Sequence, residues 1–323
     1  MSRRFRVLEL FCGLGGIAAA LGDLAEVVAA LDVDRVALGV YGANFPHPTR
    51  ARTLDSMAPS ELAAAGADLW ALSPPCQPYT RRGLGRDLDD PRAAGLRAVV
   101  AALGTGRPPF LFLENVPAFA TSRSRELVTG ALAAAGYGWR EGLLCPSELG
   151  WPNRRRRYYL LAARDGLPDP PGGPPPWGLE DPPPGRPLAA FLDPVPEPGL
   201  EVPEELARRY RHALDVVSAD DPDAVTACFT SAYGRSPVRS GSYLATGPPP
   251  GTGDPPPLRR FSPAEVLRLL GFPGSFRLPA GLPRANAWRL AGNSLSLPAV
   301  RAVLAAVPGL APAAAAAERP ARP

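Results

Sequence analysis

A cysteine between prolines is the residue of this chain whose setting most clearly suggests chemistry. Cys76 lies in Ser73-Pro-Pro-Cys-Gln-Pro78, directly after the apolar run Leu69–Leu72. Proline fixes its own φ angle and biases the preceding residue toward extended geometry, so we expect the thiol on a stiff loop at the end of a strand. A lone cysteine is most often a small buried apolar residue, but this frame favours a nucleophile. Positive charge favouring its thiolate could come from Arg81 or from the arginines at 154–157.

A glutamate directly follows another apolar run. Because Glu114 comes after residues 110–113, we expect burial to raise the pKa of its carboxyl, so that it can hold or donate a proton near neutral pH. The alternative is a solvated loop acid. The arginines at 154–157 precede a further apolar run, and in an extended segment Arg155 and Arg157 share one face. That pair could point into a site, or the whole run could be a solvated basic surface.

A glycine-rich turn follows the first apolar run of the chain. Its sequence is Phe11-Cys-Gly-Leu-Gly-Gly16, and glycine allows both tight backbone turning and close approach of a ligand. The helix that follows would point its N–H groups at that ligand. Asp32 lies at the separation along the chain from which an acid can bind ribose hydroxyls. These features predict an adenosine-containing cofactor, with a merely structural turn and the loose dinucleotide pattern Gly13-x-Gly15-x-x-Ala18 as alternatives.

Short apolar runs alternate with helix-like segments through the first half of the chain. We predict strands at 6–11, 27–31, 69–72, 110–113 and 158–163, and helices from the glycine turn to residue 25, at 93–103 and at 124–135. This alternation predicts a parallel, doubly wound α/β sheet. Ligands bind beyond the carboxyl ends of the strands in such a sheet, so the clusters described above should converge at one edge.

The composition changes at about residue 166, where proline and glycine become frequent. We expect a catalytic core at 1–165, a proline-rich linker and small target-recognition domain at 166–255, a return to the core at 256–310 and a low-complexity tail at 311–323. Helices are predicted at 203–217, after the capping sequence Ser262-Pro-Ala-Glu265, and at 297–307. Gly292-Asn293-Ser294 could cap this last helix or bind the cofactor.

The bulk composition excludes several classes of protein. The 323 residues are 46% apolar and 20% charged, which is ordinary for a soluble globular chain. We see no membrane-spanning run and no signal peptide, and therefore expect a cytoplasmic protein without a membrane partner. The four cysteines form no C-x-x-C pair, which argues against a metal site and a disulfide framework. The net charge is +4 and every basic side chain is arginine, which permits a nucleic-acid partner.

Taken together, the motifs resemble those of cytosine-C5 methyltransferases. The matching segments are Phe11-x-Gly13-x-Gly15-Gly16, Pro75-Cys76-Gln77, Glu114-Asn115-Val116, Arg155-x-Arg157 and Gly292-Asn293-Ser294, in that order. Within this family the chain looks most like the DNA methyltransferase 2 type, whose members methylate cytosine 38 of aspartate tRNA. Cys228-Phe229-Thr230 and the short recognition region carry that further likeness. Val33 departs from the pattern, since the family often has an aromatic residue there.

The resemblance implies a Rossmann-like sheet with helices on both faces, S-adenosyl-L-methionine as cofactor and a monomer that acts on tRNA or DNA. It implies catalytic roles for Cys76, Glu114, Arg155 and Arg157. It implies cofactor contacts for Phe11, Cys12, Gly13, Leu14, Gly15, Gly16, Asp32, Val33, Asp55, Pro75, Asn293 and Ser294. Substrate contacts are implied for Gln77, Thr80, Arg81, Asn115, Cys228, Phe229 and Thr230. The rival hypotheses are a restriction-type DNA methyltransferase, an NAD-dependent oxidoreductase and a nucleic-acid-binding protein without catalysis.

Overall fold

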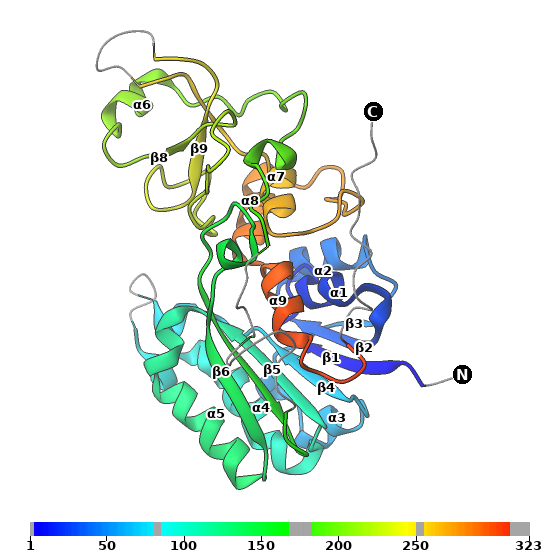
Figure 1. The fold of residues 1–323 in the computed structure, drawn as a ribbon. Coiled ribbons are helices and arrows are strands. Elements are labelled where there is room, and N and C mark those ends of the chain that lie inside the picture. Colours follow the sequence, from blue (N-terminus) through cyan, green and yellow to red (C-terminus); the bar gives the residue numbers. More distant parts are fainter. Residues whose placement is uncertain (1–2, 81–84, 168–176, 178–182, 250–254, 311–323) are drawn as a thin grey trace.

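A seven-stranded sheet forms the centre of the larger part of the molecule (Figure 1). The computed structural model describes residues 3–80, 85–167, 177, 183–249 and 255–310. The strands of the large sheet are β1 (Phe5–Leu10), β2 (Ala25–Asp32), β3 (Thr49–Ala51), β4 (Leu69–Leu72), β5 (Phe110–Asn115), β6 (Gly138–Leu144) and β7 (Arg157–Ala163). Their order is β3-β2-β1-β4-β5-β7-β6. The direction of winding therefore reverses between β1 and β4, as expected of a doubly wound sheet.

The sheet is not wholly parallel, and that part of the prediction is wrong. Strands β1 to β5 pair in parallel, but β7 is antiparallel to both β5 and β6. Residues 145–156 join β6 to β7, with one 3-10 turn at Pro146–Leu149 and no α-helix. A parallel pair needs a crossover connection that is usually an α-helix, whereas an antiparallel pair can be joined by such a loop. As a result, the start of β7 lies at the edge where β1, β4 and β5 end.

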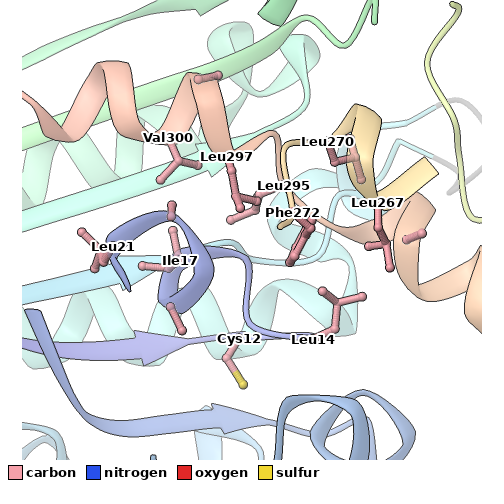
Figure 2. Close-up of a cluster of buried hydrophobic side chains, with 14 of the residues drawn as sticks. Cys12, Leu14, Ile17, Leu21, Leu267, Leu270, Phe272, Leu295, Leu297 and Val300 are labelled. Atoms are coloured by element: carbon pink, nitrogen blue, oxygen red, sulfur yellow. The ribbon is translucent and has the colours of Figure 1, made fainter. Parts of the chain in front are cut away.

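Helices cover both faces of the large sheet, which confirms the Rossmann-like prediction. The helices of the described residues are α1 (Gly16–Leu21), α2 (Arg35–Gly42), α3 (Pro59–Ala63), α4 (Ala94–Gly106), α5 (Arg123–Ala134), α6 (Glu204–Arg209), α7 (Pro263–Leu269), α8 (Arg284–Asn293) and α9 (Leu297–Leu304). Alternate strand residues enter different cores, as Val7 packs with α1, α2 and α9 while Leu8 packs with α3, α4 and α5. Figure 2 shows Ile17 and Leu21 of α1 beside Leu297 and Val300 of α9. None of these helices combines the length and apolarity needed to cross a bilayer.

A small three-stranded sheet stands apart from the large one, with α7 and α8 between them (Figure 1). Its strands are β8 (Asp215–Val217), β9 (Ser242–Ala245) and β10 (Leu258–Arg260). The helix predicted at 203–217 is wrong in its second half, because β-branched Val216 and Val217 pair with β9 instead. The chain was expected back in the core at residue 256, yet β10 still belongs to the small sheet. The outer bounds of the expected domains stay a prediction.

Element ends follow local backbone chemistry. The first strand stops one residue before the prediction because Phe11 has φ 58°, which no strand residue adopts. The first helix ends at Leu21 rather than at residue 25, because Gly22 with φ 51° breaks the helix and begins the 3-10 turn Gly22–Leu24 that leads to β2. The capped start of α7 is confirmed, since Ser262 Oγ accepts from Glu265 N at 3.1 Å and Glu265 Oε2 accepts from Ser262 N at 2.8 Å.

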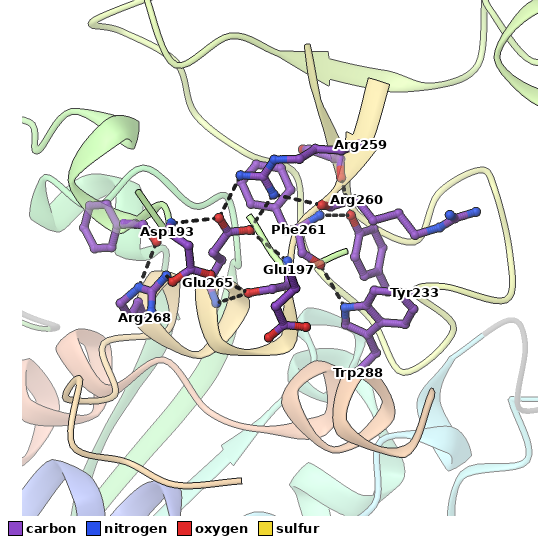
Figure 3. Close-up of polar contacts among 12 residues, drawn as sticks. Asp193, Glu197, Tyr233, Arg259, Arg260, Phe261, Glu265, Arg268 and Trp288 are labelled. Carbon is purple, nitrogen blue, oxygen red and sulfur yellow. Dashed lines mark hydrogen bonds and ion pairs between the residues drawn. The ribbon is translucent and has the colours of Figure 1, made fainter. Parts of the chain in front are cut away.

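Buried polar contacts join the small sheet to α7 and α8 (Figure 3). Arg259 of β10 makes a two-pronged ion pair with Glu265 of α7, at 2.7 Å for each bond. Phe261 N donates to Tyr233 Oη at 2.9 Å, and Trp288 Nε1 of α8 donates to Phe261 O at 2.9 Å. The orientation of the small sheet relative to α7 and α8 is therefore set by hydrogen bonds as well as by apolar packing.

Candidate active site

A cavity of about 580 Å³ lies at the point where the strand order reverses between β1 and β4. It brings together most of the residues selected from the sequence, although they lie far apart in the chain. Those that line it are Phe11, Cys12, Gly13, Leu14, Gly16, Asp32, Val33, Asp55, Pro75, Cys76, Gln77, Glu114, Asn115, Arg155, Arg157, Asn293 and Ser294. The predicted convergence at one sheet edge is therefore confirmed.

The glycine turn forms one wall of this cavity. Gly13 and Gly15 have φ angles of 53° and 96°, which side chains disfavour. A Cβ at Gly15 would lie 2.5 Å from the Phe45 ring, so this glycine is needed for packing behind the wall and does not itself line the cavity. Asp32 holds the turn in place, because its Oδ2 accepts from Gly13 N at 2.8 Å.

The same wall offers an edge suited to an adenosine. Burial raises the pKa of Asp32, although backbone N–H groups of Asp34, Gly13 and Val33 oppose the shift. Val33 is apolar and 63% exposed where it lines the cavity, so it can cover an aromatic ring. The volume is in the range of cofactor pockets. The glycine turn, the carboxylate and the apolar side chain together fit an adenosine-containing cofactor.

A buried acid beneath the glycine turn was missed by sequence reasoning. Glu9 lies within β1, and its Oε1 accepts from Ile17 N of α1 at 3.1 Å. Its Oε2 accepts from Tyr41 Oη at 3.0 Å, and Tyr41 Oη also lies 3.0 Å from His47 Nδ1. Burial raises the pKa of Glu9 to about 8 against these hydrogen bonds. The signal in the sequence is a single acid inside an apolar strand, Val-Leu-Glu-Leu, just before a helix start.

The loop carrying Cys76 is fixed from two sides. Asn115 Nδ2 donates to Pro74 O at 3.1 Å, and Ser73 Oγ donates to Phe11 O at 2.9 Å. Burial raises the pKa of the Cys76 thiol, while the charges of Arg157 and Arg155 lower it and that of Glu114 raises it. The Oε1 atom of Gln77 is buried without a hydrogen-bond partner among the described residues. The loop thus presents the Cys76 thiol to the cavity.

Glu114 lies at the end of β5, paired across the sheet with Tyr159 of β7. Its Oε1 is 3.5 Å from Arg157 Nε, and the two side chains are 9% and 14% exposed. Burial raises the pKa of Glu114, opposed by the charges of Arg157 and Arg155. The carboxyl group can therefore hold a proton beside the thiol, as the apolar run before it predicted.

Arg155 connects three segments behind the cavity wall. Its Nη1 donates to Phe229 O at 2.8 Å, and its Nη2 donates to Gly292 O at 3.1 Å and to Ser294 O. The side chain is 2% exposed, and Nε is buried without a partner among the described residues. Arg154 and Arg156 are exposed, so the predicted division of the four arginines between two faces is confirmed.

Several predicted substrate residues do not line the cavity. Phe229 is buried against Tyr233 and Phe261, Thr80 and Thr230 are half-buried outside the cavity, and Arg81 lies outside the described residues. Cys228 contacts Arg155 and Arg157 from behind, with 3.4 Å from its Sγ to a nitrogen of each. Substrate contact by these residues stays a prediction.

The segment Gly292-Asn293-Ser294 does not cap the last helix, so that alternative is wrong. Gly292 and Asn293 end α8, Ser294 follows it, and the residue preceding α9 is Ser296. Asn293 and Ser294 instead line the cavity. Gly292 is required there, because a Cβ would lie 2.2 Å from the Thr230 carbonyl carbon.

Two arginines at the cavity were missed by sequence reasoning. Arg52 and Arg92 line it and form ion pairs with Glu61 and Asp90. Each stands singly in a loop or turn, where no sequence pattern distinguishes it from other surface arginines.

Comparison with known proteins gives a consistent picture. Residues 5–193 match the family described as C-5 cytosine-specific DNA methylase. A mouse protein named tRNA (cytosine(38)-C(5))-methyltransferase is 29% identical, over 93% of this chain and 92% of its own length. A Dictyostelium discoideum protein named DNA (cytosine-5)-methyltransferase is 26% identical over 93% of both chains. The crystal structure of a Spodoptera frugiperda DNMT2 mutant superposes with a TM-score of 0.80 at 29% identity, covering 92% of this chain and 97% of that one.

Proposed function

The chain belongs to the C-5 cytosine-specific DNA methylase family and is a cytosine-C5 methyltransferase, and from this premise we propose that it methylates cytosine 38 of aspartate tRNA through a covalent adduct with Cys76. Membership of this family excludes the alternative of an NAD-dependent oxidoreductase. The observation that carries the proposal is a single cavity in which Cys76, Glu114 and Arg157 face the glycine turn.

Cys76 is the proposed nucleophile. The C5 carbon of cytosine is a poor nucleophile until the ring is activated, and addition of a thiolate sulfur at C6 supplies that activation. The S–C6 bond forms as the C5–C6 π bond breaks. The electron pair of that bond moves between C5 and C4, and the electron pair of the C4–N3 π bond moves onto N3. Arg157 and Arg155 favour the thiolate that this step requires, against the burial of the loop.

Glu114 is the proposed proton donor to the ring. Its raised pKa lets the carboxyl group donate a proton to N3 as negative charge develops there, which stabilises the adduct. Arg157 orients the carboxyl group by its contact with Oε1. Arg155 would support the site from behind the cavity wall, since both of its terminal nitrogens bind loop carbonyls.

The cofactor site is proposed from the residues of the glycine-turn wall. Members of this family use S-adenosylmethionine, which supplies the methyl group that C5 accepts. Asp32 would hold the ribose and Val33 would cover the adenine, and Asp55, which also lines the cavity, would contact the adenine edge. After methylation, water takes the C5 proton, the C5–C6 double bond re-forms as Sγ leaves as thiolate, and N3 returns its proton to Glu114.

An unpaired RNA loop suits this chain better than a DNA duplex. A cytosine must leave its stack before it can enter the cavity, and this costs less by a few kcal/mol when the base is already unpaired. Among the described residues, the proposed recognition part contributes a sheet of three short strands. The name of the mouse relative supports the tRNA substrate, while that of the Dictyostelium relative keeps a DNA substrate as the second candidate.

The decisive experiment measures transfer of labelled methyl groups to an unmodified aspartate tRNA transcript and to duplex DNA. We expect label in the tRNA, none in a transcript whose cytosine 38 is replaced by uridine, and none with Cys76→Ala. Label in duplex DNA alone would make the DNA alternative correct. A 5-fluorocytosine in the transcript should trap Cys76 covalently, because the fluorine blocks the final proton loss. The expected monomeric state and cytoplasmic location remain predictions.

A further inference from the structure

Cys228 lies between the two arginines of the active site and is used by no step above. Its Sγ atom is 3.4 Å from Nη1 of Arg155 and 3.4 Å from Nη2 of Arg157. Burial raises the pKa of this thiol, but the charges of Arg157 and Arg155 and their hydrogen bonds outweigh burial and lower it overall. The site therefore favours a thiolate at this position more than at an ordinary cysteine.

The surrounding charges need such an anion. Glu114 is the carboxyl group in contact with the pair, at 3.5 Å from Arg157 Nε. When Glu114 carries a proton, as the proposed chemistry requires, Cys228 is the group among the described residues that can balance the two guanidinium charges through hydrogen bonds to both, while Cys76 interacts with these charges without a hydrogen bond to either arginine. Uncompensated buried charge is costly, so a neutral cysteine would drive the proton off Glu114. The groups that act on Glu114 are Arg157, Arg155, Cys76 and Tyr159, and those that act on Cys228 are the two arginines.

We propose that Cys228 is a positioning residue, whose thiolate balances Arg155 and Arg157 and thereby lets Glu114 keep its proton. The inference rests on the proposed function, because the proton matters for the attack on cytosine. Arg157 divides its contacts between the sulfur at Nη2 and Glu114 at Nε. Without the thiolate, the guanidinium group would pair with Glu114 alone and favour the ionised carboxylate.

The thiol acts through the arginines and not on the substrate. Cys76 lines the cavity, whereas Cys228 does not. The loop of Cys228 is also held by Arg155, which binds the next carbonyl, that of Phe229, and reaches Gly292 O on the cofactor side. The sulfur thus forms part of the contact between the recognition segment and the catalytic edge of the sheet.

The test compares Cys228→Ser, which removes the charge, with Cys228→Asp, which restores an anion of similar size. We expect Cys228→Ser to lower kcat about tenfold at neutral pH, with KM for tRNA little changed. The alkaline limb of the kcat profile, where Glu114 loses its proton, should move to lower pH in this variant. Cys228→Asp should recover most of kcat and return the limb toward the wild-type position. Cys145→Ser, a buried thiol outside the cavity, is the matched control and should leave the profile unchanged.

Three outcomes would overturn the proposal. A Cys228→Ser profile with the wild-type limb would show that the thiol carries no charge that Glu114 senses. A loss of kcat that Cys228→Asp does not rescue would indicate packing alone. Trapping of a 5-fluorocytosine transcript on Cys228 instead of Cys76 would make it the nucleophile.

A measurement independent of catalysis separates this inference from the proposed function. In a Cys76→Ser background, the ultraviolet absorbance of the thiolate is titrated with and without the additional Cys228→Ser change. The difference should titrate below the ordinary cysteine pKa of about 8.5. A difference that titrates above that value would refute the thiolate. If the wild-type enzyme methylates neither tRNA nor DNA, the proposed function fails, while this titration still reports the state of Cys228.

Discussion

Two buried ion pairs, one at the catalytic edge and one between the two sheets, use the same residue types for different ends. Glu265 and Arg259 form two parallel bonds of 2.7 Å, and Glu265 also accepts from the backbone N–H groups of Ser262 and Asp193. Glu114 meets Arg157 through a single contact of 3.5 Å and has a raised pKa. A carboxylate whose oxygens are fully used holds two elements together, whereas one left under-used keeps capacity for a proton and a substrate.

Glu9 adds a third case to this comparison. It is buried like the other two, but its hydrogen bonds among the described residues come from a tyrosine and a backbone N–H. Burial raises the pKa of Glu9 to about 8 against these hydrogen bonds. The three buried carboxyl groups therefore differ in how they are paired: Glu265 has a two-pronged ion pair, Glu114 has a single contact with an arginine, and Glu9 has hydrogen bonds from a tyrosine and the backbone.

The largest effect is expected where the pairing is loosest. Glu114→Gln keeps the shape of the side chain but removes its acidic proton, so kcat should fall by about 10²–10⁴. The melting temperature should stay close to that of the wild type, because a neutral group already suits this site. Single-turnover methylation of tRNA and a thermal melt measure the two quantities. Near-normal turnover would mean that Glu114 is not the proton donor.

The opposite result is expected for the tight pair. Glu265→Gln leaves Arg259 as a buried charge without its carboxylate, which should cost about 3–5 kcal/mol of unfolding free energy. The kcat of the protein that remains folded should be unchanged, because the pair lies at the joint between the sheets. Urea titration gives the first value. The control is the double variant Arg259→Met with Glu265→Leu, which should recover much of the lost unfolding free energy. If Glu265→Gln alone is as stable as the wild type, the contrast between the two ion pairs does not hold.

Glu9 should make stability depend on pH. Its folded pKa of about 8 exceeds its unfolded value near 4.5, so the folded state binds the extra proton between these values. The contribution of Glu9 to the unfolding free energy is therefore fully present below about pH 4.5, and it declines by a few kcal/mol as the pH rises toward 8. Glu9→Gln should flatten this slope, which urea midpoints at several pH values would reveal. An unchanged slope in the variant would assign the dependence to other groups.

The smallest effect concerns the capped start of α7 beside the tight pair. Ser262→Ala removes the acceptor for Glu265 N, and loss of such a cap typically costs about 1 kcal/mol. A modest fall in the urea midpoint with unchanged kcat is expected. A loss as large as that of Glu265→Gln would mean that the serine, and not the ion pair, organises the joint.

The sequence predicted the site better than the fold around it. Cys76, Glu114 and Asp32 were located correctly because each ends an apolar strand, and the strand ends share an edge. The strand β7 was predicted, but its antiparallel direction was missed because an apolar pattern does not encode direction. The strand β3 was missed because its three residues are all exposed. Glu9 was overlooked inside a strand, where an apolar pattern conceals a single acid. The placement of Cys228 depends on a contact spanning 73 positions, which no local pattern reveals.

The strand β7 and the arginines before it have an unusual sequence, Arg-Arg-Arg-Arg-Tyr-Tyr-Leu-Leu-Ala-Ala from 154 to 163. Because neighbours are identical in pairs, sliding this segment by one position would put nearly the same side chains on each face. The hydrophobic pattern of this segment therefore does little to fix the register in which it pairs with its neighbouring strands. The register is set by hydrogen bonds just before the strand. Asn153 Nδ2 donates to Thr226 Oγ1 at 3.0 Å, and Arg155 donates to the carbonyl oxygens of Phe229, Gly292 and Ser294. The register of this repetitive strand is therefore fixed by contacts of residues that precede it and not by its own apolar pattern.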